Sequence, residues 1–377
     1  MAKKLRVAVL YNEPLGSVET SQKYVSENGL IQDGPPSATV RTKSDTLPPL
    51  KTPKTKRNPE PVQVDLSELG VVGEMEDIKE ALVSLGYRTS IMNVDSELFR
   101  LIDYLRKEKP DLIFNLVECV ENEAIQEMHV AGIYELLKIP YTGAGPLTLG
   151  TALNKPRVKE ILSYYGIRTP KFQVFPVSEK IVLREDLTFP LIVKPSREDA
   201  SVGIDDASVV YSVSELKKRV RYIFNEFDQP ALVEEYIEGR ELNIALVGND
   251  KPLVLPISEI DFSGLTDDMH KIVSYEAKWV EGTVAYAGTQ GVCPASLPPD
   301  LEEELKDIAT RCYRIIGCRD YGRVDFRLTR EGIPYVLEVN PNPDISDDAG
   351  FARSARSHGF TFPQVIGKIV DSALERL

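Results

Sequence analysis

Residues 321–344, YGRVDFRLTREGIPYVLEVNPNPD, are the stretch that decides the fold of this 377-residue chain. The pattern predicts two strands, residues 322–328 and 333–340, joined by a short turn around Gly332. Side chains alternate between the two faces of a strand, and a slip by one residue would expose an apolar set. One core is therefore expected to receive both apolar sets, which are Val324, Phe326 and Leu328 and, on the second strand, Tyr335, Leu337 and Val339.

The same alternation puts four polar side chains on the opposite face, and these are Arg323, Asp325, Glu338 and Asn340. Mg²⁺ prefers oxygen ligands and is usually bound through one or two carboxylates plus substrate phosphates. An arginine beside such ligands suits negative charge that develops during phosphoryl or acyl transfer. The hairpin alone leaves two interpretations open, a cation site and an ordinary solvated face, because half-exposed sheets also alternate charged with apolar residues.

The composition is typical of a soluble globular protein, with 42% hydrophobic and 27% charged residues and room for two or three domains. The formal net charge of −13 argues against nucleic acid or an anionic membrane as the main partner. No stretch is long and apolar enough to cross a bilayer, and the N-terminal apolar run ends at Glu13 and Pro14. The four cysteines lack metal-ligand spacing. A cytoplasmic protein with reduced thiols is expected.

The N-terminal part alternates strands with helices, which predicts a small parallel sheet. The expected strands are residues 5–11, 88–94 and 111–116, and the expected helices are residues 73–85, 97–107 and 124–137. Residues 28–65 hold seven prolines and a basic cluster but few large apolar residues, which indicates an insertion with little packed core. Residues 1–146 are therefore expected to form an N-terminal α/β domain.

The remaining chain predicts two further domains, residues 147–235 and 236–377. The first is a small α+β unit with a helix over residues 155–165 that ends at Gly166, and a helix over residues 213–227 that is capped by Ser214. The second has expected strands at residues 242–247 and 253–260, a long polar loop over 263–291, and helices at 299–316 and 362–374.

Two other segments carry candidate chemistry. Lys194 ends an apolar strand before the loop of residues 196–203, and a lysine beside such a loop suits phosphates, although a surface lysine before a proline is also common. Residues 232–241, LVEEYIEGRE, end a strand in two carboxylates before a turn at Gly239. This segment could read a planar base edge and hold a ribose hydroxyl at Glu241, or it could simply connect two domains.

Taken together, eight segments resemble the ATP-grasp superfamily, and most closely its D-alanine–D-alanine ligase-like branch. They follow the family's order and are IPYTGAG (139–145), NKPRVKEIL…YGIRTP (154–170), PLIVKP (190–195), LVEEYIEGREL (232–242), YEAKW (275–279), CPASL (293–297), YGRVDFR (321–327) and EVNPNP (338–343). Several matches in order are far more specific than any one. The resemblance implies an ATP-grasp fold, with α/β and α+β parts, and an ATP site between the central and C-terminal domains.

The resemblance also implies roles for individual residues. The residues expected to contact ATP are Lys155, Lys194 and Lys278 for the phosphates, Glu234, Glu235 and Ile237 for the adenine, and Glu241 for the ribose. Asp325, Glu338 and Asn340 match ligands of two Mg²⁺ ions, with Mn²⁺ as an alternative metal, and Arg323 matches the arginine that stabilises the tetrahedral intermediate. The implied activity is that of an ATP-dependent carboxylate–amine ligase, a homodimer that forms a dipeptide-like amide through an acyl phosphate.

Departures from the family pattern fall on substrate recognition. The D-alanine-specific branch has a His-Gly segment after the third strand, where this chain reads NLVECVEN at residues 115–122. That branch also has a glycine and then a serine after the metal-binding asparagine, where this chain has an acidic segment. Acids there would repel a carboxylate and attract an amine. A different pair of small-molecule carboxylate and amine substrates is expected, with candidate contacts at Glu13, or Glu19 in its place, and at Asp344, Asp347, Asp348 and Arg353. The last four could equally form a polar loop that caps the last domain.

The loop of residues 196–203 lacks the usual glycine-serine-serine run and carries Glu198 and Asp199. This irregularity leaves room for an alternative, a nucleotide-binding protein that has lost ligation and acts as a sensor or partner. The four polar residues of the hairpin favour the ligase, because a binding module has no need to keep them together.

Overall fold

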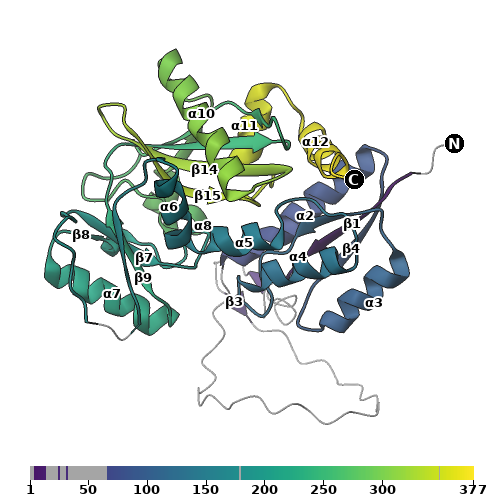
Figure 1. Cartoon of the computed structure of the whole chain (residues 1–377), viewed down its shortest axis with the longest axis horizontal. Coiled ribbons are helices and arrows are strands. Elements are labelled where there is room, and N and C mark those ends of the chain that lie inside the picture. Colours follow the sequence, from purple (N-terminus) through teal and green to yellow (C-terminus); the bar gives the residue numbers. More distant parts are fainter. Residues whose placement is uncertain (1–3, 14–23, 26–30, 33–65, 178–179, 348) are drawn as a thin grey trace, which may run out of the picture.

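The computed structural model describes all residues except 1–3, 14–23, 26–30, 33–65, 178–179 and 348 (Figure 1). The proline-rich segment near residues 28–65 lies outside the described residues, apart from a short strand, β3 (Ile31–Gln32), which pairs with β2 (Tyr24–Val25). None of the helices in the described ranges combines the length and apolar character needed to cross a membrane.

The N-terminal part forms a three-stranded parallel sheet in the order β4-β1-β5, as the sequence predicted. The elements of this part are β1 (Arg6–Tyr11), α2 (Leu66–Ser84), β4 (Arg88–Asn93), α3 (Leu98–Glu108), β5 (Leu112–Leu116) and α4 (Gln126–Leu136). All five residues of β5 are buried, which is typical of a parallel strand covered on both faces. In Figure 1, α2, α3 and α4 surround this sheet, and Leu101 and Leu105 of α3 share a core with Ala8 and Leu10 of β1.

The middle of the chain forms a four-stranded antiparallel sheet in the order β6-β9-β7-β8. Its elements are α5 (Pro146–Leu153), α6 (Lys155–Tyr164), β6 (Phe172–Phe175), β7 (Leu191–Pro195), β8 (Val209–Val210), α7 (Val213–Phe227) and β9 (Ala231–Glu235). Gly166 follows α6 with φ of +71°, which confirms the predicted glycine after this helix. The predicted Ser214 cap of α7 was wrong. Ser212 is the N-cap, because its extended backbone precedes the first turn and its hydroxyl accepts from Glu215 N.

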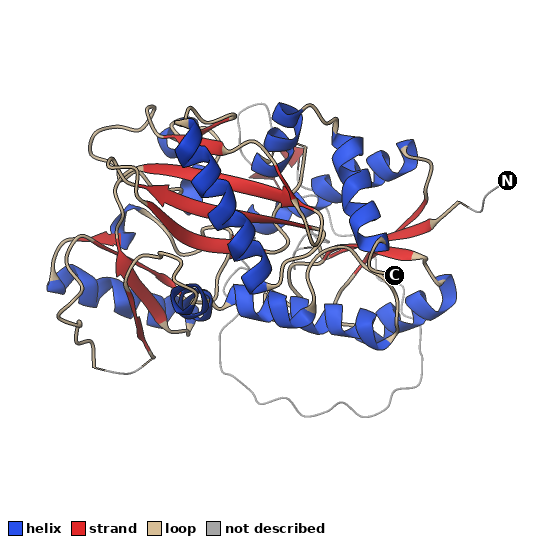
Figure 2. Cartoon of the chain, turned by 45° about the horizontal axis from the view of Figure 1, so that its top comes forward, coloured by secondary structure: helices blue, strands red, loops and turns tan. Residues whose placement is uncertain are grey.

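The C-terminal part is built on a six-stranded sheet in the order β13-β12-β10-β14-β15, with β11 paired to β10. The strands are β10 (Arg240–Val247), β11 (Leu253–Val254), β12 (Ser258–Asp261), β13 (Gln290–Val292), β14 (Tyr321–Leu328) and β15 (Pro334–Asn340). The helices are α8 (Tyr275–Trp279), α9 (Val284–Ala287), α10 (Pro299–Ile316), α11 (Gly350–His358) and α12 (Phe362–Leu374). Figure 2 shows α10 lying across the long strands of this sheet.

Two predictions for this part were wrong. The strand expected over residues 253–260 is interrupted, because Pro256 has no N–H for the ladder, and it separates β11 from β12. The segment 263–291, expected to be a loop, contains the short helices α8 and α9. Each of these helices begins with a hydroxyl cap, Ser274 or Thr283, whose side chain accepts from the third residue of the helix. α11 was not predicted at all.

The apolar residues of β14 and β15 pack into one core against α10, as the alternation predicted for the first strand. The residues of this core from the hairpin are Val324, Phe326, Leu328, Val336 and Val339. Leu337 and Tyr335 were expected in the core, but they are only half-buried. A β-bulge is the reason, since Asp325 pairs with Glu338 while Phe326 pairs with Val336, which leaves Leu337 as an extra residue.

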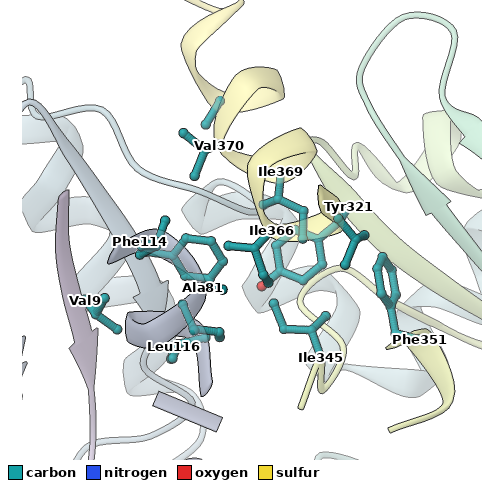
Figure 3. Close-up of a cluster of buried hydrophobic side chains, with 14 of the residues drawn as sticks. Val9, Ala81, Phe114, Leu116, Tyr321, Ile345, Phe351, Ile366, Ile369 and Val370 are labelled. Carbon is teal, nitrogen blue, oxygen red and sulfur yellow. The ribbon is translucent and has the colours of Figure 1, made fainter. Parts of the chain in front are cut away.

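A second core joins the N-terminal sheet to the C-terminal part (Figure 3). It contains Val9 and Phe114 from the parallel sheet, Tyr321 from β14, and Ile366 and Ile369 from α12. The helix α12 accordingly packs against α2, although almost 300 residues separate them in the chain. The two parts therefore share buried apolar surface, and β14 is anchored at its start by this core.

Candidate functional site

The four polar side chains predicted to share one face of the hairpin are in direct contact. Arg323 donates to Asp325 through Nε and Nη2, both at 2.8 Å. Asn340 Nδ2 lies 2.9 Å from Asp325 Oδ2 and 3.4 Å from Glu338 Oε1. The bulge at Leu337 keeps Asp325 directly opposite Glu338, so it changes the apolar face and leaves the polar face intact. The placement predicted from alternation is confirmed for these four residues.

Lysines from the preceding segments approach the same face. Lys155, at the start of α6, lies 2.7 Å from Asp199 Oδ1 and 3.6 Å from Glu338 Oε2. Burial alone would raise the pKa of Glu338, but the charges of Lys155, Lys194 and Arg323 outweigh it and lower the pKa to about 2. Lys155 is 7% exposed, so the solvated position that is common for a lysine at a helix start does not apply here.

A buried ion-pair triad lies beside this face. Glu234 on β9 is 1% exposed, with Lys194 Nζ 2.6 Å from its Oε1 and Lys159 Nζ 2.8 Å from its Oε2. Burial would raise the pKa of Glu234, but the two lysines lower it below its ordinary value. Lys159 was missed in the sequence. It lies four residues after Lys155 on α6, a spacing that places both on one side of a helix.

The segment expected to bind adenine and ribose connects β9 to β10. Glu235 Oε2 accepts from Lys171 N at 3.1 Å, and Ile237 is half-buried in the connection itself. Glu241 Oε2 lies 2.9 Å from Arg327 Nη2, a partner that the sequence did not indicate. Gly239 has φ of +146°, and a Cβ there would lie 2.0 Å from Leu328 O, so only glycine allows the turn that brings Glu241 to this position.

Lys278 on α8 faces the polar side of the hairpin. Its pKa is lowered, first by burial, and is also affected by the charges of Asp344, Arg323, Glu118 and Glu338. Two hydrogen bonds tie α8 to the loop of residues 196–203 and its neighbour, because Trp279 Nε1 donates to Ala200 O at 2.8 Å and Tyr275 N donates to Ile204 O at 2.9 Å. The loop of residues 196–203 and the segment that contains α8 are therefore in contact with each other.

The candidate substrate residues are only partly brought together. Asp344 accepts from Ser346 N at 3.0 Å and Oγ at 2.6 Å, and it lies close enough to Arg323 to raise the pKa of that side chain.

The other candidates lie elsewhere. Glu13 accepts from the Tyr11 hydroxyl at 2.8 Å. Asp347 is exposed and pairs with Arg356 at 2.7 Å, while Arg353 lies 3.5 Å from Ser258 Oγ. Asp348 lies outside the described residues.

The hairpin face offers a donor set that fits a hard divalent cation. Asp325 and Glu338 supply two carboxylates that share Asn340 as a neighbour, and the adjacent lysines suit phosphate oxygens. No group of three or more His, Cys, Asp or Glu side chains in the described ranges is arranged to hold a metal. A cation at this face would therefore depend on oxygens of its substrate to complete its coordination.

Comparison with known proteins agrees with this geometry. The family model described as D-ala D-ala ligase C-terminus matches residues 161–371. The chain is 32% identical over 308 residues to the D-alanine–D-alanine ligase of Carboxydothermus hydrogenoformans, covering 79% of this chain and 91% of that protein. It is 33% identical over 306 residues to an uncharacterised protein of Sinorhizobium fredii, covering 80% of this chain and 87% of that protein.

Among solved structures, the D-alanine–D-alanine ligase of Bacillus anthracis complexed with ATP shares the fold with a TM-score of 0.68 at 22% identity, and 98% of each chain is covered.

The fold and the hairpin face define an ATP-dependent carboxylate–amine ligase of the ATP-grasp superfamily. Within it, the chain belongs to the D-alanine–D-alanine ligase family. ATP and a small-molecule substrate pair are implied by that family, and Mg²⁺ is its typical metal. The alternative of a nucleotide-binding protein without ligase activity has no support in these comparisons.

Proposed function

We propose that this ligase forms an amide through an acyl phosphate, using a substrate pair other than two molecules of D-alanine. The observation that carries the proposal is the contact between Arg323, Asp325, Glu338 and Asn340 on one face of the hairpin. Two carboxylates beside an arginine suit the phosphates of ATP and the negative charge that develops when an acyl group is transferred. No side-chain nucleophile is required.

The reaction has two steps. An oxygen of the substrate carboxylate attacks the γ-phosphorus of ATP, the bond to the β–γ bridging oxygen breaks, and ADP leaves. The amine nitrogen then attacks the carbonyl carbon, the amide forms, and inorganic phosphate leaves with the loss of one proton from the amine. Arg323 stabilises the oxyanion of the second step, since its guanidinium lies at the hairpin face and keeps its charge at every relevant pH.

The nucleotide contacts follow from the elements around that face. In this proposal Lys155, Lys194 and Lys278 bind phosphates, Glu234, Glu235 and Ile237 bind the adenine, and Glu241 binds the ribose. The proximity of Lys155 to Glu338 and the influence of the Arg323 charge on the pKa of Lys278 support the phosphate contacts. The burial of Glu234 between two lysines supports a positioning role for its carboxylate, with the neighbouring backbone left to read the base.

The metal ligands in this proposal are Asp325, Glu338 and Asn340. Two Mg²⁺ ions, or Mn²⁺ in their place, would neutralise charge on the phosphates when bound. The residues of the chain hold the phosphates in line with the attacking carboxylate. The hydrogen-bonded segments around Ala200 and Trp279 exclude water from the acyl phosphate, which would otherwise be hydrolysed.

Asp344 supports the choice of a different substrate pair. It stands where the D-alanine-specific branch has a glycine, and it lies near both Arg323 and Lys278. A carboxylate at this position repels the carboxylate of an amino-acid amine and attracts a cation. Glu13 and Asp348 are weaker candidates for substrate contacts. Glu13 is hydrogen bonded to Tyr11, and Asp348 lies outside the described residues.

The domain division at residues 1–146, 147–235 and 236–377 and a homodimer formed through the first domain are part of the same proposal. Exposed apolar side chains on that domain support the dimer, with Phe99 and Leu136 each 84% exposed. Light scattering at micromolar concentration checks it. A cytoplasmic location is supported by the four free cysteines, since thiols stay reduced there.

The test measures ADP release when the enzyme is given ATP, Mg²⁺ and pairs of amino acids of D and L configuration. Mass spectrometry then identifies the amide. We expect turnover with a pair other than D-alanine twice. Fastest turnover with D-alanine alone contradicts the substrate proposal, and tight ATP binding without ADP release from any pair contradicts the ligase. Asp344→Gly should shift preference at least about tenfold toward amines that bear a carboxylate. Asp347→Asn, at the exposed ion pair, is the matched control.

A further inference from the structure

One of the lysines proposed to bind phosphate is already paired with an anion of the chain itself. Lys155 Nζ donates to Asp199 Oδ1 at 2.7 Å. Asp199 belongs to the loop of residues 196–203, which lacks the glycine-serine-serine run that is usual in the family. A carboxylate oxygen therefore accepts a charge-assisted hydrogen bond that a phosphate oxygen would need.

The surroundings of Lys155 are strongly negative. Glu338 Oε2 lies 3.6 Å from the same Nζ. Burial lowers the pKa of Lys155, but the charges of Asp199, Glu338 and Glu198 outweigh burial and raise the pKa above its ordinary value. An ammonium that is surrounded in this way attracts a phosphate less than a free one does, because the nearby carboxylates offset its charge.

Asp199 differs in burial from the carboxylate that pairs with another of these lysines. Glu234, the partner of Lys194, has a side chain that is 2% exposed and is also held by Lys159. The side chain of Asp199 is 55% exposed. An exposed carboxylate loses little when its ion pair breaks, whereas a buried carboxylate is left uncompensated. Asp199 is therefore the carboxylate that can give up its lysine.

The backbone around Asp199 is held in place by the next residues of the loop. Ser201 Oγ donates to Val273 O at 2.9 Å, on the segment that leads into α8. Ala200 and Ser201 have left-handed backbone conformations, with φ of +53° and +63°, so the chain turns directly after Asp199. The release of Lys155 therefore requires a rotation of the Asp199 side chain and no opening of the loop.

We propose that Asp199 competes with an ATP phosphate for Lys155, so that this carboxylate must leave the ammonium when the phosphate binds. Asp199 is thus a residue that lowers the affinity for nucleotide phosphates. The inference rests on the phosphate-binding role proposed above for Lys155 in the ligase. Because the competition needs a phosphate, Asp199 should have no influence on the binding of adenosine.

Calorimetric titration of the whole protein tests the competition. The ligands are ATP with Mg²⁺, in the absence of the other substrates, and adenosine. Asp199→Asn should bind ATP at least about threefold more tightly than the unaltered protein, because the competing charge is removed, and should bind adenosine equally well. Unchanged or weaker binding of ATP overturns the proposal. An equal gain for adenosine also overturns it, since that gain would not depend on phosphate.

The chain offers a closely matched control in Asp205→Asn. Asp205 pairs with Arg219 at 2.9 Å, and these side chains are 54% and 7% exposed, against 55% and 8% for Asp199 and Lys155. The control therefore breaks an ion pair of the same exposure that does not involve Lys155, and it should leave the affinity for ATP unchanged. The same gain in Asp205→Asn overturns the proposal, because it shows that the loss of either ion pair has this effect.

A double-mutant cycle separates competition for Lys155 from simple repulsion between Asp199 and phosphate. In Lys155→Met, Asp199 has lost its ammonium partner and can turn to water. Asp199→Asn added to Lys155→Met should therefore change the affinity for ATP by less than about twofold. A gain as large as in the protein with Lys155 overturns the competition, since Asp199 would then act on the phosphate directly.

Turnover separates this inference from the ligase function. Tighter binding of ATP by Asp199→Asn, without ADP release from any substrate pair, supports the competition and contradicts the ligase. ADP release by the unaltered protein, together with an unchanged affinity for ATP in Asp199→Asn, contradicts the competition and leaves the ligase intact.

Discussion

Two sets of buried or half-buried carboxylates flank the reaction centre, and their surroundings are opposite. On the nucleotide side, Glu234 lies between Lys159 and Lys194 at ion-pair distance. On the substrate side, Glu74 and Glu127 accept only neutral hydrogen bonds from described residues. The first set is complete within the chain, whereas the second has no cationic partner among the residues that the structure describes.

This difference follows from what each side has to bind. ATP binds in every turnover. The charges on that side can therefore be paired with one another in the folded chain before the nucleotide binds. On the other side, acids buried without counter-charges reduce the stability of the folded protein when they are ionised. Glu74 and Glu127 have no cationic partner among the described residues, and the following experiments test the contrast with Glu234.

The largest effect is expected at the hairpin face itself. Asp325→Ala or Glu338→Ala should reduce ATP turnover at least about 10³-fold, because each removes a carboxylate expected to position the metal and phosphates. Circular dichroism and denaturant unfolding should show an intact fold. A rate of ADP release within about threefold of the unaltered enzyme would remove that residue from the site.

Glu234→Gln should lower the free energy of unfolding by about 3–5 kcal/mol, because it leaves two buried lysines without a counter-charge. The pKa of Glu234 is below its ordinary value of 4.5, so its contribution is full above that pH and is lost as the pH falls below it. The difference between the two proteins should therefore shrink below pH 4.5. Glu235→Gln, whose lysine partner is exposed and 3.8 Å away, should cost less than about 1 kcal/mol.

Glu74→Gln should raise the free energy of unfolding, whereas Glu234→Gln should lower it. The pKa of Glu74 is raised by burial, so ionisation of the unfolded chain above pH 4.5 destabilises the folded protein, while both states hold the proton below that pH. The variant should be more stable by about 1–3 kcal/mol at pH 8 and equal at pH 4, as measured by urea unfolding. Glu76 is exposed on the same helix, so Glu76→Gln should leave the free energy of unfolding unchanged at both pH 8 and pH 4. Destabilisation at pH 8 would show that Glu74 is charge-compensated after all.

The smallest effect separates the two buried tyrosines. Tyr321→Phe removes a hydroxyl that has no partner among the described residues and should change stability by less than about 0.5 kcal/mol. Tyr313→Phe removes a hydrogen bond to Gly248 O at 2.8 Å and should cost about 1 kcal/mol. An equal loss of stability in both variants, measured by thermal unfolding, would mean that the Tyr321 hydroxyl is hydrogen bonded in the protein. That result would weaken the contrast between the two sides of the reaction centre.

Alternation along the hairpin was enough to place Arg323, Asp325, Glu338 and Asn340 together, because a strand has a fixed two-residue period and a buried face permits one register. The same rule failed at Leu337, since a bulge adds a residue that no local pattern reveals. Lys159 and Arg327 were missed for another reason. A lysine on a helix and an arginine on a strand look solvated until the carboxylates that they meet are known.

By itself, the sequence determined the alternating strands and helices of the parallel N-terminal sheet, the hairpin of β14 and β15 and its polar face, because periodicity and turn residues act locally. It did not indicate α8, α9 or α11. Only the tertiary structure decided which buried charges are compensated. Glu234 meets lysines from α6 and β7, whereas Glu74 meets a backbone N–H more than 270 residues away. The energy of a buried charge depends on neighbours that packing supplies, and these lie at sequence distances over which no residue pattern carries information.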